Sequence, residues 1–455
     1  MAIGIIFVVV LVLCIAKPKY GIFGIFLFAI VLSNALQQGF VQTNRVFSAP
    51  LSLVPLSGID LIDRQGTRLL TLVLFVSTLT RGFFRKQVLK EKWLVMAIAS
   101  ITFLSTLSMV VNDISFKNGL SSISLFAISL LFLFSVLNVK FEHREITMFL
   151  RALLLFVSLN AVVQIYQFFT FADGDIDMTP GLLMSTTPTS TIAFVTILFF
   201  VGKSTIGKID KTVWVSVAVA IAQLGSSYLK GIVAFAMVIV IGFRKVFSQG
   251  GRALVASLIV LTVLFGISSF LFTDAVKDYG VFRAIPDIES VVKLGPIRVW
   301  TQFFELLQNP TNLVLGYGPS SYGSLNTTDE MGTRTSRLAQ LISIAGVGEF
   351  EGRDLFVTAL SSAGNILWEN GMFVFLLFFG VHFKVFRDAA KIHAYPRSDW
   401  LKVYSFGVKY GLVFVLLLYF TAFGVTTEEV LLWGPIFVVY SFVKSEYHLR
   451  LVKDS

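Results

Sequence analysis

The chain is poor in cysteine, histidine and charge. Its single cysteine, Cys14, cannot form an internal disulfide, and with only four histidines a structural zinc site is not expected. Charged residues make up 14% of the 455 positions, whereas soluble domains carry about 25%. Residues 2–16 are apolar but have neither a basic leader nor a small-x-small cleavage site, so we expect no cleavable signal peptide. These absences point away from a soluble, disulfide-stabilised protein.

What the chain has instead is apolar sequence. Hydrophobic residues make up 55% of it, 46 residues are phenylalanine, and the mean hydropathy is +0.81. The net charge of +10 could suggest nucleic acid. However, lysine and arginine cluster in short connections between apolar runs, which is typical of the cytoplasmic loops of membrane proteins. We therefore expect membrane lipid around the chain and no nucleic-acid partner.

Apolar runs that could cross a membrane, each needing about 20 residues, recur along the chain. We predict spans at 2–16, 21–36, 67–80, 93–111, 120–138, 147–171, 182–202, 212–229, 231–243, 253–273, 357–383, 403–423 and 429–443. The predicted fold is an all-α polytopic integral membrane protein with about 12–14 transmembrane helices in a single membrane domain, 1–455. Because the basic C-terminal tail is expected in the cytoplasm, an odd number of spans places the N-terminus outside. An inward N-terminus requires a further crossing or a re-entrant segment within 37–66, and both alternatives stay open.

The positive-inside rule orients these spans. Basic connections are expected in the cytoplasm, and they are 81–92, 203–211, 244–252, 384–402 and the tail 444–453. The turns between them are acidic or weakly charged, and they are 112–119, 172–181 and 427–429. Alternation then places residues 274–356 on the outer face, as one large periplasmic or extracellular loop inserted between transmembrane helices.

The segment 274–354 is the only long polar stretch in the chain, and about eighty residues are far more than a turn needs. Two parts of it, 296–309 and 334–345, have the residue spacing of helices. Its arginines could grip an anionic substrate bidentately, or they could form an ordinary solvated surface. They are Arg283, Arg298, Arg334, Arg337 and Arg353. We predict that this loop carries the working site.

Lys230 stands between two apolar runs, at the expected outward edge of the membrane. A lysine at this depth either snorkels to the interface or meets an anion or a cavity. Gln164 and Gln167 fall within one predicted span, where they could line the same cavity or simply bond neighbouring helices. The sequence leaves both choices open.

Four local patterns resemble those of a known family. They are Gly181–Ala193, Leu229–Gly231, Arg298–Trp300 followed by Leu315–Gly318, and Asn365–Gly371. In order and spacing they are similar to patterns of the bacterial O-antigen polymerase and O-antigen ligase superfamily (Wzy/WaaL-like). The resemblance covers roughly residues 150–380 and includes a large periplasmic loop near the C-terminal third. It implies a GT-C-like fold in the bacterial inner membrane, with the active loop facing the periplasm.

The resemblance also implies an activity, that of a metal-independent glycosyltransferase without a cofactor. Such a polymerase joins lipid-linked polysaccharide repeat units of an O-antigen, capsule or exopolysaccharide. A sugar hydroxyl of one repeat unit attacks the glycan that another undecaprenyl diphosphate carries. The expected partners are this undecaprenyl-diphosphate-linked oligosaccharide and a chain-length regulator protein of the same pathway.

Residue roles follow from the same resemblance. Diphosphate is a good leaving group, so the protein must mainly stabilise its charge and position the acceptor, and we expect Lys230 and Arg298 to do so. A base could come from three acids that could equally be partners of the arginines, and they are Glu349, Glu351 and Asp354. Substrate binding is expected of Arg283, Arg334, Arg337, Arg353, Tyr317, Gln164 and Gln167.

Two departures from the family bear on the choice between its members. Pro296 stands where family members often carry arginine, and no histidine precedes the Asn365–Gly371 segment. The four histidines, at 143, 382, 393 and 448, fall in or near predicted cytoplasmic regions. A missing histidine disfavours a ligase more than a polymerase. The ligase is the nearest alternative, and a lipid-linked oligosaccharide flippase, another transporter, or a receptor or scaffold are alternatives of other classes.

Overall fold

A computed structural model of the chain describes most of its apolar sequence. The described residues are 2–43, 56–84, 91–171, 181–183, 186–226, 229–243, 307–319, 362–421 and 429–454. Within these ranges the regular structure is α-helical apart from one short 3-10 turn, and it includes no strand. The predicted span at 253–273 and most of the predicted loop at 274–356 lie outside the described residues.

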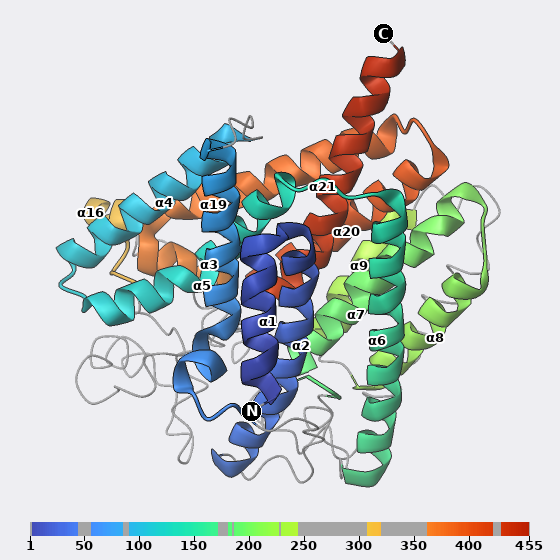
Figure 1. The fold of residues 1–455 in the computed structure, drawn as a ribbon, viewed down its shortest axis with the longest axis horizontal. Coiled ribbons are helices and arrows are strands. Elements are labelled where there is room, and N and C mark those ends of the chain that lie inside the picture. Colours follow the sequence, from blue (N-terminus) through green and yellow to red (C-terminus); the bar gives the residue numbers. More distant parts are fainter. Residues whose placement is uncertain are drawn as a thin grey trace.

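The helices follow the apolar runs of the sequence (Figure 1). They are α1 (Ala2–Ala16), α2 (Pro18–Thr43), α3 (Asp60–Phe84), α4 (Lys92–Val111), α5 (Phe116–Leu137), α6 (His143–Phe171), α7 (Thr186–Val201), α8 (Lys211–Ser226), α9 (Leu229–Phe243), α16 (Pro310–Leu315), α19 (Ser362–Ala394), α20 (Asp399–Thr421) and α21 (Glu429–Asp454), with the 3-10 turn η2 (Gly202–Ile206) after α7.

Six helical segments among the described residues are long and apolar enough to cross a membrane. They are Pro18–Ala35, Lys92–Val111, His143–Gln167, Thr189–Ile206, Ala363–Ala394 and Asp399–Phe420. Three shorter apolar helices accompany them, and they are Ala2–Ala16, Phe126–Leu137 and Lys211–Gln223. The predicted all-helical, multi-pass character is therefore confirmed in this coarse form. The count of 12–14 spans, the GT-C-like arrangement and the periplasmic loop stay predictions.

Burial distinguishes an inner helix from an outer one. In α7 every residue from Ile192 to Phe199 is at most 1% exposed, so this helix packs on all sides. On α4, by contrast, Met96, Phe103 and Val110 are 71%, 67% and 69% exposed. Their spacing of seven residues puts them on one face, as expected for a stripe that meets lipid.

Several helix termini lie together among the described residues, on what we call the basic side: residues 16–19, 81–84, 91–92, 139–145, 202–211, 384–402 and 440–454. Several of these ranges overlap the connections predicted to be cytoplasmic. Contacts join the helix termini there. Arg81 donates to the carbonyl of Ala16 (2.8 Å), Lys19 pairs with Glu145 (2.5 Å), and other pairs join the remaining termini. These are Lys208 with Asp399, His143 with Trp400, and Lys444 with Glu91. They run through the upper part of Figure 1, where α21 projects.

A cluster of paired charges lies on the basic side. Lys444 forms ion pairs with Glu91 and with Asp388 (3.4 Å), and Tyr440 donates a hydrogen bond to Asp388 (2.7 Å). Burial alone would raise the pKa of the Glu91 carboxyl. Hydrogen bonds from Lys444 and Trp93 and nearby lysine charges outweigh burial, so the pKa lies below its usual 4.5. This network ties α4, α19 and α21 together.

Candidate functional site at the break in helix α19

Helix α19 is broken at Gly371, whose backbone has φ 82° and ψ 173°. In an unbroken helix the carbonyls of Trp368 and Glu369 would accept hydrogen bonds from the amides four residues later. The break removes those partners. In an apolar environment free backbone carbonyls are costly, so other donors must replace the lost ones.

Residues Leu315–Gly318, which we call the hook, supply these donors. The amide of Tyr317 donates to the carbonyl of Trp368 (2.8 Å), and the amide of Gly318 donates to the carbonyl of Glu369 (3.1 Å). The ring of Tyr317 stacks on that of Trp368, with centroids 5.7 Å apart and planes 15° apart. A segment distant in sequence thus caps the first half of α19.

The short helix α16 positions the hook beside α4 and α19 (Figure 1). It begins with Pro310 in its first turn, and Asn309 caps it by accepting a hydrogen bond from the amide of Asn312 (3.3 Å). It ends at Gly316, whose φ of 72° suits glycine. The chain then turns directly onto α19.

Two glycines allow the hook and the break to interlock. A Cβ atom built on Gly371 would collide with the carbonyl oxygen of Val314 and lie 2.8 Å from the amide of Gly316. A Cβ atom on Gly316 would lie 2.5 Å from the carbonyl oxygen of Glu369. Both residues also have positive φ, so the sequence needs glycine at each position for conformation and for space.

Glu369 is the acidic group of this site, and its side chain is held by α5. Ser122 donates a hydrogen bond to its Oε2 atom (2.7 Å), and Ser108 of α4 donates to its backbone carbonyl (3.3 Å). Asn112 adds a bond from its amide to the carbonyl of Gly316 (3.3 Å). Glu369 is only 2% exposed. An ionisable residue within a membrane-spanning helix is a functional candidate, because burying it costs stability.

Three side-chain oxygen atoms on α19 and α4 lack hydrogen-bond partners among the described residues. The Oδ1 atoms of Asn365 and Asn370 and the Oγ atom of Ser105 are buried, and none has a hydrogen-bond partner within the part of the chain that the structure describes. Each such atom costs about 1–3 kcal/mol when left unsatisfied. Native proteins keep few of them, and a catalytic role or a bound water or ion is a usual reason.

Gln164 and Gln167 lie in a separate cluster of amides where α6 meets the turn before α7. The side chain of Gln167 brackets Gly181, accepting from its amide (2.8 Å) and donating to its carbonyl (3.2 Å). Gln164 accepts hydrogen bonds from Asn160 (3.2 Å) and Gln223 (2.5 Å). Both glutamines are at most 1% exposed. These contacts favour the alternative in which they bond neighbouring segments, and their predicted role in substrate binding stays a prediction.

The other predicted site residues divide into two groups. Tyr317 is part of the hook, and the backbone of Lys230 lies in the first turn of α9, although its side chain is outside the described part. The remaining predicted residues lie outside the described ranges: Arg283, Arg298, Arg334, Arg337, Glu349, Glu351, Arg353 and Asp354.

Sequence reasoning assigned no role to Glu369, Ser122 or Asn370. A signal for Glu369 was present, because it is the only acidic residue in the predicted span 357–383. Nothing comparable marks the serine or the asparagine, since both residue types are common in transmembrane helices. Their importance comes from contacts between distant segments.

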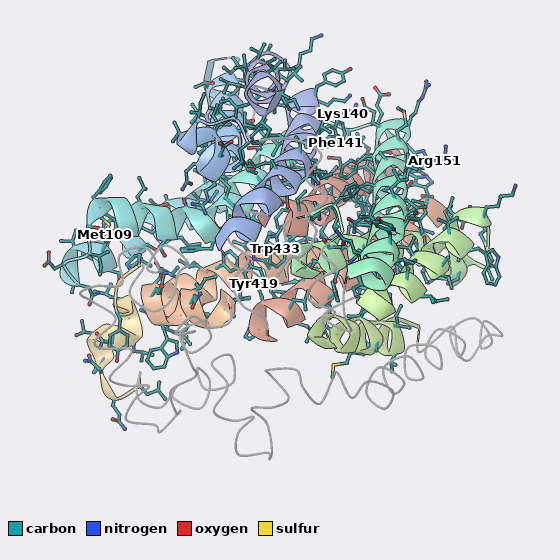
Figure 2. The ribbon with its side chains drawn as sticks, turned by 90° about the horizontal axis from the view of Figure 1, so that it is seen from below. Met109, Lys140, Phe141, Arg151, Tyr419 and Trp433 are labelled. Carbon is teal, nitrogen blue, oxygen red and sulfur yellow. The ribbon has the colours of Figure 1, made fainter. Side chains whose placement is uncertain are left out.

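No histidine or metal cluster accompanies Glu369 among the described residues. His382 is fully buried inside α19, with its Nδ1 atom 2.8 Å from the carbonyl oxygen of Phe378. Its ring packs against Trp433, which donates to Tyr419 (3.0 Å), and Figure 2 shows these last two side chains close together. No group of three His, Cys, Asp or Glu side chains in the described ranges could hold a metal ion.

Comparison with known proteins gives no family for the chain. No protein-family model matches the sequence, and no curated protein matches it significantly.

Proposed function

We propose that the protein is a polymerase of lipid-linked polysaccharide repeat units. It transfers a glycan from undecaprenyl diphosphate onto a sugar hydroxyl of another lipid-linked repeat unit, at the periplasmic face of a bacterial inner membrane. The observation that supports this most is the docking of the hook onto the break in α19. These two segments, Leu315–Gly318 and Asn365–Gly371, belong to two of the four patterns that resemble the polymerase and ligase superfamily, and the first follows Arg298–Trp300 in its pattern.

That docking is independent of the resemblance itself. In the sequence the two patterns are separate short motifs. Contact between their glycines is expected only if the motifs form one site. In the structure Gly371 lies against Gly316, and the amide of Gly318 donates to the carbonyl of the acidic residue Glu369. A buried carboxylate fixed beside a loop segment is a suitable arrangement for chemistry on a hydroxyl group.

The reaction asks little of the protein beyond charge stabilisation and positioning. We assign the diphosphate to Lys230 and Arg298, because cations stabilise the charge that develops on the leaving group. Arg283, Arg334, Arg337 and Arg353 would hold the rest of the anionic lipid carrier. No nucleotide is needed, because the donor sugar is already activated as a diphosphate ester.

A reconstitution experiment tests this function. Purified full-length protein in detergent is given a synthetic undecaprenyl-diphosphate repeat unit, without nucleotide or added metal. We expect a ladder of longer glycans on gels. If several chemically different repeat units give no product while the protein moves them across liposomes, the polymerase is excluded.

Charge-removal variants test the two assigned cations. Lys230→Ala and Arg298→Ala are expected to abolish the ladder, because the leaving diphosphate loses its counter-charges. The matched controls are Lys211→Ala and Arg397→Ala, which remove exposed cations on the basic side. An unchanged ladder in either test variant would remove that residue from the mechanism.

A transporter of lipid-linked oligosaccharide is the second candidate, and the break in α19 favours it. Transporters often bind substrate where transmembrane helices are interrupted. The liposome arm of the reconstitution separates the two: a transporter moves the labelled lipid between leaflets without lengthening its glycan, and a polymerase lengthens it.

A further inference from the structure

We propose that the break in α19 binds the acceptor sugar and that Glu369 takes the proton from its attacking hydroxyl. This inference rests on the proposed polymerase function and assigns the base that the reaction needs. It separates two subsites by charge: the cations of the loop and α9 hold the diphosphate, and the break holds a neutral, hydroxyl-rich group.

The unsatisfied atoms at the break indicate the ligand class. The Oδ1 atoms of Asn365 and Asn370 are hydrogen-bond acceptors without a partner among the described residues. An ionised diphosphate offers only acceptors in return and cannot satisfy them. Sugar hydroxyls donate, so a polyhydroxylated acceptor can satisfy these atoms without bringing a charge into the site.

These atoms lie close enough for one ligand. Asn365 and Glu369 are four residues apart on one helix, so their side chains are neighbours on the same face. Lys384 lies over the ring of Trp93 (5.3 Å) and Glu369 contacts Ser108, so α19 and α4 run antiparallel. Ser105 precedes Ser108 by three residues and is therefore level with the start of the second half of α19. Its hydroxyl is buried and has no partner among the described residues.

The proton and electron balance of the step is complete without an added reactant. The acceptor oxygen forms a bond to the anomeric carbon of the donor, and the bond from that carbon to the phosphate oxygen breaks. The leaving diphosphate keeps the electron pair. The proton of the acceptor hydroxyl goes to Glu369 and is later released to water.

The first test removes the base. Glu369→Gln keeps the size of the side chain, and we expect it to lengthen glycans at least about 100-fold more slowly than the natural protein, as for loss of a general base. The natural protein should lose activity at acidic pH, and the variant should lack that decline. Glu446→Gln, a half-buried glutamate on the basic side, is the matched control and should behave as the natural protein. A Glu369→Gln variant with unchanged rate and pH profile would overturn the assignment.

A second test distinguishes a base from a structural residue. Azide attacks an anomeric carbon without losing a proton, so it should restore donor consumption in Glu369→Ala and yield a glycosyl azide. A merely misfolded variant would not be rescued. Failure of azide in a Glu369→Ala protein that still binds the donor would overturn the role as base.

A third test works without any turnover. Binding of the free repeat-unit oligosaccharide, lacking lipid and diphosphate, is measured by ligand-detected NMR, alongside binding of inorganic diphosphate. Asn370→Ala should weaken oligosaccharide binding about tenfold, as expected for lost hydrogen bonds worth about 1.4 kcal/mol, and leave diphosphate binding unchanged. Asn138→Ala on the basic side is the control.

Equal oligosaccharide binding by Asn370→Ala and the natural protein would overturn the acceptor site. Oligosaccharide binding by a natural protein that makes no ladder would exclude the polymerase but keep the site.

Discussion

Among the described residues, polar groups are paired on the basic side and partly unpaired on the opposite side of the same helices, which we call the hook side because the hook contacts α19 there. Helices α4 and α19 contribute to both. At one terminus Glu91 and Asp388 share Lys444, and each charge has a partner. At the other terminus Asn370 and Ser105 keep buried atoms that no described residue satisfies. A protein gains stability from the first arrangement and loses it in the second, so the second is where function is expected.

The largest effect on stability should follow from adding a side chain at Gly371, where α19 contacts the hook. Gly371→Ala places a Cβ atom against the carbonyl of Val314 and forces a backbone conformation that alanine rarely adopts. We expect a loss of more than about 3 kcal/mol of unfolding free energy, or release of the hook. Thermal unfolding in detergent, followed by tryptophan fluorescence, measures it.

The matched control lies in the same helix. Gly380 of α19 has open space around a built Cβ, so Gly380→Ala should stabilise the protein slightly, by about 0.5–1 kcal/mol. Equal unfolding temperatures for the two alanine variants would contradict the interlock.

Breaking the network of the basic side should have the next largest effect. Lys444→Ala leaves Glu91 and Asp388 without their shared cation, and the side chain of Glu91 is only 18% exposed. We expect a loss of about 2 kcal/mol, less than for a fully buried pair. Lys208→Ala breaks an exposed pair with Asp399 and should change stability by less than about 0.5 kcal/mol. Urea titration of both variants compares them, and equal losses would mean that burial does not matter here.

Removing an unsatisfied atom should raise stability on the hook side. Asn370→Leu has a similar shape, and its buried Oδ1 atom accepts no bond in the described ranges, so we expect a gain of about 1 kcal/mol. The same change should reduce glycan lengthening. A fall in unfolding temperature would show that Asn370 is satisfied in the free protein, and the contrast between the two sides would disappear.

The smallest effect is the response of the basic side to acid. The folded-state pKa of Glu91 lies below 4.5. Burial alone would raise the pKa of Asp210, but hydrogen bonds from Lys203 and Thr212 and the charge of Lys203 together outweigh it and lower the pKa from 3.8 to about 2. Both groups therefore stabilise the fold above about pH 4.5, and that contribution is lost as the pH falls further. The unfolding temperature should decline between pH 5 and pH 3, and less so in Glu91→Gln. An identical decline in that variant would exclude Glu91 as a cause.

The helices were predictable because apolar runs end at charged or turn residues. The predicted 2–16 and 93–111 match α1 (Ala2–Ala16) and α4 (Lys92–Val111) almost residue for residue. The end of α19 was predicted too early, since the helix continues past the apolar run into basic residues. Hydropathy indicates the apolar length that can cross a membrane. It does not detect a helix end that consists of charged residues.

The site was predictable only in part. The patterns at Leu315–Gly318 and Asn365–Gly371 were visible in the sequence, but their contact was not, because nothing local indicates that two glycines far apart will meet. Gln164 and Gln167 were correctly placed inside a helix, yet their partners lie in a turn and another helix. Long-range polar contacts produce no periodic pattern in the sequence.

The hook holds α19 through backbone amides, and this has a consequence for how such a protein can diversify. The bonds from residues 317 and 318 depend on chain geometry and on two glycines, not on which side chains neighbour them. The sequence on either side of the hook can therefore change to suit a new sugar while Glu369 keeps its place. A loop exchanged between relatives should keep working if the Gly316–Gly318 spacing is preserved, which makes the hook a natural junction for chimeras.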